Sequence, residues 1–169
     1  MRRLLVLVVA GLALGALSQP AAADIRLKVG WFDPQAALDG GLAYGADVDL
    51  PIPMLNLYLS TDYTRSSTTQ LVGSSLVTAT ARAWNLSVGK RFGAGALGLG
   101  VYAGAEVGLT NWTNTGDIPG VISSGSGNDL TLSGVAGIKA RRYAIEGKYR
   151  LGDLPKAEQG FSLWVCYRL

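Results

Sequence analysis

The feature that most constrains this chain is a repeated alternation of apolar and polar residues between positions 24 and 169. Successive side chains of a β-strand point to opposite faces, so this alternation predicts strands with one apolar and one polar face. Eight segments show the pattern. They are residues 25–31, 41–50, 55–64, 80–91, 97–109, 129–141, 143–151 and 161–169.

The connections between these segments are alternately short and long. The predicted short turns are residues 51–53, 92–95 and 140–142, and the predicted long polar loops are residues 32–40, 66–79, 111–128 and 152–160. This arrangement is typical of an all-β, eight-stranded antiparallel up-and-down transmembrane β-barrel. In such a barrel both chain ends and the short turns face the periplasm, and the long loops face outside.

The polar faces of the segments carry most of the charged residues. A bilayer offers backbone groups no water, so strands cross it only in a closed sheet, with the apolar faces toward lipid. The charges would then line the lumen, with both signs nearly balanced. An eight-stranded barrel is just wide enough to be filled by side chains, so we predict a plug of paired charges. The predicted lumen charge network is Arg26, Lys28, Asp47, Asp49, Asp62, Glu106, Lys139, Glu146, Lys148, Arg150 and Arg168.

The first 23 residues differ from the rest of the chain. Arg2 and Arg3 precede an apolar run from residue 4 to residue 17, and small residues end the segment at Ala23. This order is typical of a secretory signal peptide, and the run is too short for a comfortable transmembrane helix. We therefore expect a signal peptide over residues 1–23, cleaved near Ala23, followed by one barrel domain over residues 24–169.

The composition argues against several classes of function. The chain has no histidine, which removes the commonest general base and metal ligand, and Cys166 is its only cysteine. Without Arg2 and Arg3 the basic and acidic residues nearly balance, so nothing indicates a nucleic-acid partner. Residues 93–98 match G-x-G-x-x-G but lack the following helix that a dinucleotide site requires. We predict no catalytic residue, cofactor or metal, and hence no enzyme.

The last nine residues carry a more specific pattern. Residues 161–169 alternate apolar side chains with an aromatic third from the end, and so resemble the C-terminal strand by which bacterial outer-membrane barrels are recognised for insertion. Leu169 departs from the usual final Phe. The predicted insertion signal is Phe161, Leu163, Val165, Tyr167 and Leu169.

The whole chain from residue 24 resembles the small eight-stranded outer-membrane proteins, such as the transmembrane barrel of outer membrane protein A. This resemblance implies a location in the bacterial outer membrane and contact with its lipid. It also implies insertion by the barrel insertion machinery and a monomeric state. Barrels of this kind that transfer acyl groups on lipid A use a His beside a Ser, which this chain lacks.

Three functions remain open at the level of sequence. The first is a structural or interaction protein of the cell envelope that presents four loops outside. The second is a narrow or gated pore, suggested by the charged lumen and by small residues such as Gly100, Gly104 and Gly137. The third is a soluble periplasmic ligand-binding barrel, which would have the opposite sidedness.

Overall fold

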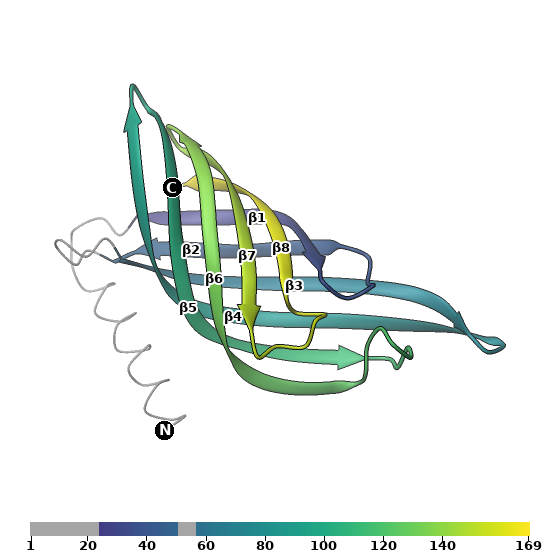
Figure 1. Cartoon of the computed structure of the whole chain (residues 1–169). Coiled ribbons are helices and arrows are strands. Elements are labelled where there is room, and N and C mark those ends of the chain that lie inside the picture. Colours follow the sequence, from purple (N-terminus) through teal and green to yellow (C-terminus); the bar gives the residue numbers. More distant parts are fainter. Residues whose placement is uncertain (1–23, 51–56) are drawn as a thin grey trace.

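The computed structural model describes residues 24–50 and 57–169, which form a closed antiparallel barrel of eight strands (Figure 1). Each strand pairs with the next along the chain, and β1 pairs with β8 to close the sheet. The strands are β1 (Ile25–Pro34), β2 (Gly41–Asp49), β3 (Leu57–Val72), β4 (Ser75–Ala96), β5 (Leu99–Thr115), β6 (Gly125–Ala140), β7 (Tyr143–Gly152) and β8 (Gly160–Arg168). The predicted fold class is confirmed.

The register of the strands shows how far the sheet is staggered. Following direct partners around the barrel from Asp49 leads through Glu106 and Arg150 to Pro34 on β1. Asp49 itself lies beside Asp24, to whose carbonyl its backbone N–H donates over 3.0 Å. One circuit therefore advances by ten residues along β1. A stagger of this kind requires the strands to tilt, by roughly 35–45° in closed barrels.

The side chains alternate between the two faces of the sheet as the sequence pattern predicts. Outward positions such as Val29, Val107 and Leu132 hold aliphatic side chains that are about half exposed. Inward positions hold buried polar and charged side chains, among them Glu106 and Lys148. The barrel is therefore apolar outside and polar inside, the reverse of a soluble protein.

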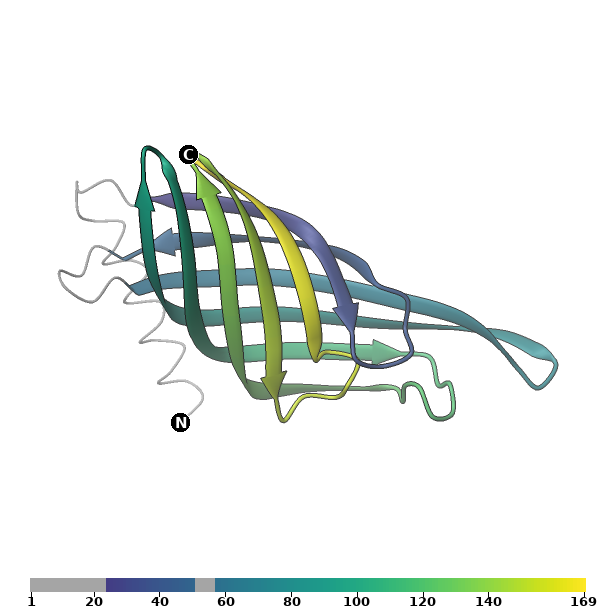
Figure 2. The ribbon, with the colours of Figure 1, turned by 45° about the horizontal axis from the view of Figure 1, so that its top comes forward.

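The strands fall into two groups by length. β1, β2, β7 and β8 have 9 or 10 residues, close to the roughly 9–11 that a tilted strand needs to cross a bilayer. β3 to β6 have 16 to 22 residues and extend beyond the others. The β3–β4 hairpin projects at one end of the barrel, and the β4–β5 hairpin projects at the other, near the C-terminus (Figures 1 and 2).

We call the end that holds Leu169 and the β4–β5 and β6–β7 turns the turn end, and the opposite end the loop end. The predicted loop at 66–79 is wrong, because β3 and β4 pair as far as Val72 and Ser75 around a turn at Gly73. The hydroxyls of Thr69 and Thr78 hydrogen-bond across this hairpin at 2.9 Å.

Two further connections differ from the predictions. The turn expected at 92–95 is wrong, since β4 continues to Ala96 and the chain turns at Leu97 and Gly98. The loop expected at 111–128 shortens to residues 116–124, because β5 and β6 remain paired to Asn114 and Gly125. The predicted signal peptide and the predicted turn at 51–53 lie outside the described residues. Within the described part of the chain, no helix is long and apolar enough to span a membrane.

Candidate functional site

The centre of the lumen is filled by a cluster of buried ionic side chains. The Lys148 ammonium lies 2.6 Å from carboxylate oxygens of both Asp62 and Glu106. Arg150 forms a second ion pair with Asp62. All four side chains are at most 2% exposed. The four residues come from β3, β5 and β7, so the cluster joins distant parts of the barrel wall.

A second ionic cluster lies nearer the turn end. Asp47 on β2 accepts from Lys28 at 2.7 Å and from Arg91 at 2.6 Å. Arg91 also contacts Glu146 on β7 at 2.8 Å. Sequence reasoning missed Arg91. Arg91 is two residues from Gly89 on the same strand, so both lie on the face of the sheet that lines the lumen. The alternation of the strand could therefore have assigned Arg91 to the charge network.

Neutral hydrogen-bonding groups complete these clusters. Tyr58 donates to Glu106 at 2.7 Å, and Tyr102 donates to Glu146 at 2.9 Å. Asn85 on β4 donates to Asp62 at 3.2 Å. Buried charges are tolerated only when they are paired and hydrogen-bonded, and most of the carboxylate oxygens here are. We call the two ionic clusters and these partners the plug.

Glycines on the inward face make room for the two tyrosine rings. A Cβ placed on Gly89 would lie 2.5 Å from Cζ of Tyr58, and one on Gly137 would lie 2.6 Å from Cζ of Tyr102. Any side chain at either position would displace a ring that hydrogen-bonds a plug carboxylate. These glycines therefore serve the packing of the lumen and leave no open space.

Four residues of the predicted charge network lie outside the plug. Arg26, Asp49 and Lys139 line a cavity of about 290 Å³ at the turn end of the lumen, and Arg26 approaches Asp47 only to 3.9 Å. Arg168 lies at the rim, where it is 56% exposed and pairs with Asp24 at 2.5 Å. The seven other predicted residues are brought together in the plug.

The loop end of the lumen is closed by an apolar cluster that the sequence did not predict. Residues from three loops meet small residues of β4 there. The cluster contains Leu38, Ala79, Ala81, Ile118, Ile122 and Ala157. Its members from the loops are isolated aliphatic residues that follow no periodic pattern in the sequence. Only the three-dimensional structure shows that they pack together. We call this group the loop cap.

Glu158, in the β7–β8 loop, is buried beside the loop cap. One of its carboxylate oxygens has no hydrogen-bond partner, and burial raises the pKa of Glu158 to about 7, although Arg150 acts in the opposite direction. The burial of this carboxyl group is therefore only partly offset by the charge of Arg150.

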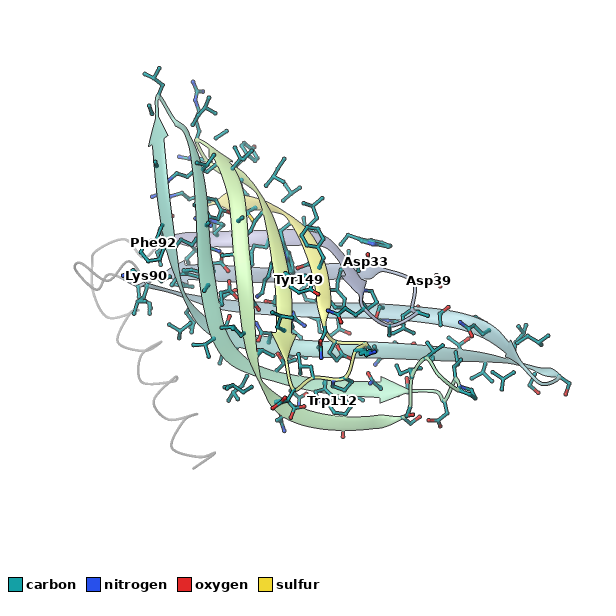
Figure 3. The ribbon with its side chains drawn as sticks, viewed as in Figure 1. Asp33, Asp39, Lys90, Phe92, Trp112 and Tyr149 are labelled. Atoms are coloured by element: carbon teal, nitrogen blue, oxygen red, sulfur yellow. The ribbon has the colours of Figure 1, made fainter. Side chains whose placement is uncertain are left out.

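Aromatic side chains gather on the outer surface toward the two ends of the barrel. Tyr44, Tyr63 and Trp84 occupy direct register positions on β2, β3 and β4, with neighbouring ring centroids 4.9 Å apart. At the turn end, Tyr143 and Tyr167 lie with centroids 5.2 Å apart. Lys90 extends over the ring of Phe92 on the outside of β4 (Figure 3). Aromatic belts of this kind occur at membrane interfaces.

The residues of the predicted insertion signal lie on β8 or at its end, at the seam where the barrel closes. Phe161, Leu163 and Val165 point outward, and Val165 pairs in register with Val29 of β1 and Ile145 of β7. This placement makes one apolar strip across the seam.

The arrangement of the described residues offers ion pairing and packing. Among residues 24–50 and 57–169, no group of three or more His, Cys, Asp or Glu side chains is placed to hold a metal ion. The plug carboxylates are paired with cations, and Cys166 is buried in a packed cluster with Phe32 and Trp164.

Comparison with known proteins gives matches in structure alone. No protein-family model matches the chain, and no curated protein matches it in sequence. The structure of Ail, the attachment invasion locus protein of Yersinia pestis, in complex with the heparin analogue sucrose octasulfate, is similar at 13% identity, with a TM-score of 0.51. That match covers 87% of this chain and 99% of Ail. Neisserial surface protein A (NspA) is similar at 15% identity, with a TM-score of 0.56, over 86% of this chain and 95% of NspA. The chain therefore has the closed eight-stranded fold of the small outer-membrane β-barrels, as its sequence resemblance implied.

Proposed function

We propose that this chain is an integral outer-membrane barrel with a filled lumen, serving the cell envelope as a structural and interaction protein. The observation that carries the proposal is the inverted polarity of the barrel. Lys148, Glu106 and Asp62 are buried inside, while aliphatic side chains such as Leu132 cover the outside. Lipid is the solvent that makes this distribution stable.

The proposal includes how the chain reaches the membrane. Residues 1–23 would direct secretion and be removed near Ala23, and the strip formed by Phe161, Leu163, Val165, Tyr167 and Leu169 would present the last strand to the insertion machinery. A monomer suits the closed sheet, because every strand of the membrane-crossing part already has two partners.

The long hairpins support an interaction role at the loop end. Pairing of β3 with β2 ends at Thr64, and pairing of β6 with β7 ends at Thr131. Beyond these points β3 to β6 continue as a projecting sheet. Ser67 still forms an isolated bridge with Asp39, and past it the sheet has two edges without a neighbouring strand among the described residues, at 68–72 and 125–130. Exposed strand edges can accept an extended segment of another protein. The external surface is therefore where we place specific binding.

The two alternatives find less support. A soluble ligand-binding barrel needs an apolar interior, whereas the plug of this barrel holds seven buried ionic side chains and the partly buried Arg91. A pore needs a water-filled path through the lumen. In this barrel Trp164, Glu106 and Lys148 fill the middle of the lumen, and each is at most 1% exposed to solvent. We expect planar bilayers containing the protein to stay silent across salts and voltages. Steady conductance steps would overturn the filled-lumen proposal.

A matched pair of substitutions tests the membrane assignment. Val29 is 54% exposed at the middle of the membrane-crossing strand β1, and Leu76 is 76% exposed at the tip of the β3–β4 hairpin. Arginine near the bilayer midplane costs roughly 2–4 kcal/mol of barrel stability, and near zero outside the membrane. We expect V29R to lose this amount in vesicle-refolded protein, measured by urea titration of the heat-modifiable gel band. We expect L76R to match wild type. Equal effects of the two changes, or wild-type protein in a soluble periplasmic fraction, would refute the assignment.

A second experiment tests the orientation. Cys166 is buried, so a cysteine introduced at Ser74 would be the only accessible thiol among the described residues. We expect a membrane-impermeant maleimide to label S74C on intact cells, and to label A96C, at the opposite end, only after permeabilisation. The reverse pattern would show that the loop end faces the periplasm.

A further inference from the structure

Two turns at the turn end contact each other directly. Residues Leu97 and Gly98 join β4 to β5, and residues Arg141 and Arg142 join β6 to β7. The backbone N–H of Arg141 donates to the carbonyl of Gly98 over 2.8 Å. The two hairpins are thereby fixed relative to each other outside the strand ladder.

Each of these turns holds a non-glycine residue in the left-handed region of backbone space. Leu97 has a φ of 55° and Arg141 a φ of 53°. Residues with a Cβ avoid this region, and a bulky residue there is a genuine outlier. Glycine would remove the strain at either position, as Gly98 does next to Leu97. Retained strain of this kind points to a role for the side chain itself.

The side chains of both strained residues border one groove of about 600 Å³, which we call the turn groove. Its walls combine three kinds of side chain. They are the aliphatic Leu97 and Leu99, the aromatic Tyr143 and Tyr167, and the cationic Arg141 and Arg142. Leu99 and Tyr143 follow the outward parity of their strands and are about 60% exposed, so the groove opens on the outer surface of the barrel.

Among the described residues, no acidic side chain pairs with the arginines of the turn groove. Neither Arg141 nor Arg142 forms a salt bridge with any described residue, and Asp24 at the nearby rim is paired with Arg168. The groove thus presents two guanidinium groups beside an apolar wall. Guanidinium groups bind phosphate in a bidentate manner, and a zwitterionic headgroup would bring an ammonium group into a site that is already positive.

We propose that the turn groove binds one anionic phospholipid of the periplasmic leaflet. The phosphate lies against Arg141 and Arg142, and an acyl chain lies along Leu99 and the tyrosine pair toward the apolar belt. Leu97, at the tip of the hairpin, covers the glycerol end of the lipid. This inference rests on the proposed membrane location, because the tyrosine pair at the end of the apolar belt places the groove at headgroup depth. It gives the strained Leu97 a function, which is to cover that end of the lipid.

The test uses the protein from residue 24, refolded in detergent micelles that contain equal amounts of phosphatidylglycerol and phosphatidylethanolamine. Native mass spectrometry counts the lipids retained by the folded barrel. We expect wild type to retain one phosphatidylglycerol in preference to phosphatidylethanolamine. Basic residues near an anionic surface contribute enough that losing two should weaken binding about 30-fold in R141Q/R142Q.

The controls separate the groove from general charge. Arg65 and Arg82 form an outward pair in register near the loop end, so R65Q/R82Q should retain the lipid as wild type does. L97G should keep or gain stability, because it relieves strain, and still bind the lipid more weakly. This variant decides the question if the double arginine variant does not fold. Millimolar inorganic phosphate should not displace the lipid.

Several outcomes would overturn the proposal. These are equal retention of the two lipids by folded wild type, unchanged binding in both groove variants, equal losses in R65Q/R82Q, or full displacement by inorganic phosphate. They leave the membrane assignment standing, because the barrel is folded in each case. A chain that never gives a heat-modifiable folded form in micelles or vesicles would instead refute the proposed function and this inference together.

Discussion

Replacing Lys148 by methionine probes the ionic centre of the plug. The Lys148 ammonium is the cation closest to Glu106, and it shares Asp62 with Arg150. In K148M, Asp62 keeps Arg150. Glu106 keeps only the hydroxyl donors Tyr58, at 2.7 Å, and Ser87, at 2.9 Å. The substitution therefore leaves one buried carboxylate without a contacting cation.

The expected loss follows from this imbalance. Removing one partner of a buried ion pair costs roughly 3–5 kcal/mol, because the remaining charge stays desolvated. Neutralising that charge as well, in K148M/E106Q, should recover about 2 kcal/mol or more, since a hydrogen-bonded amide can replace the carboxylate. The pair Arg168–Asp24 is the matched control, because it is exposed at the rim. R168Q should cost about 1 kcal/mol at most.

The assay is reversible urea unfolding in phospholipid vesicles, followed by tryptophan fluorescence at neutral pH. The unfolding free energies of the variants are calculated with one common m-value, the slope of free energy against urea concentration. Changes in the unfolded state then do not distort the differences in stability between variants. The reasoning would be refuted if K148M lost less than about 1 kcal/mol, or if the second change in K148M/E106Q simply added a further loss.

Two further predictions concern packing and protonation. Alanine at Gly89 should cost about 1–3 kcal/mol by displacing the Tyr58 ring, whereas alanine at Gly134, which meets no atom within 4 Å, should be neutral or mildly stabilising in the same urea assay. Glu158 has a raised pKa in the folded state. Its loop should therefore be most stable below the usual carboxyl pKa of about 4.5, and lose up to about 3 kcal/mol as pH rises through 7. Hydrogen exchange of residues 153–159 between pH 4.5 and 8, corrected for intrinsic rates, should show this slope in wild type and none in E158Q. A slope that persists in E158Q would assign it to another group.

The sequence predicted the membrane-crossing part of the fold because lipid enforces alternation there. Each strand must be apolar on one side and polar on the other, so residues such as Val29 and Lys28 reveal their faces directly. Outside the belt no face of a hairpin meets lipid, and exposed residues such as Thr69 and Thr78 are polar and carry no such signal. The hairpin at 66–79 therefore reads as a polar loop, although its backbone pairing continues.

The plug was predictable in composition, and its pairing was not. Parity assigns charges to the lumen, but which carboxylate meets which cation depends on the stagger of the whole sheet. Lys148 and Asp62 lie 86 positions apart and on strands that are not neighbours. The loop cap was not predictable at all, because Leu38, Ile118 and Ala157 become a cluster only after the barrel brings their loops together.

The loop cap has a consequence for how this surface can vary. Because three loops share one apolar cluster, a change of length or residue in one of them alters the support of the others, and these loops must change together. The turn at Gly73 stands apart, since a side chain added to Gly73 would meet no atom within 4 Å. A foreign peptide inserted between Gly73 and Ser74 should thus be displayed at the tip of the paired β3–β4 hairpin without disturbing the barrel. The same peptide inserted beside Ile118 should loosen the packing of the loop cap.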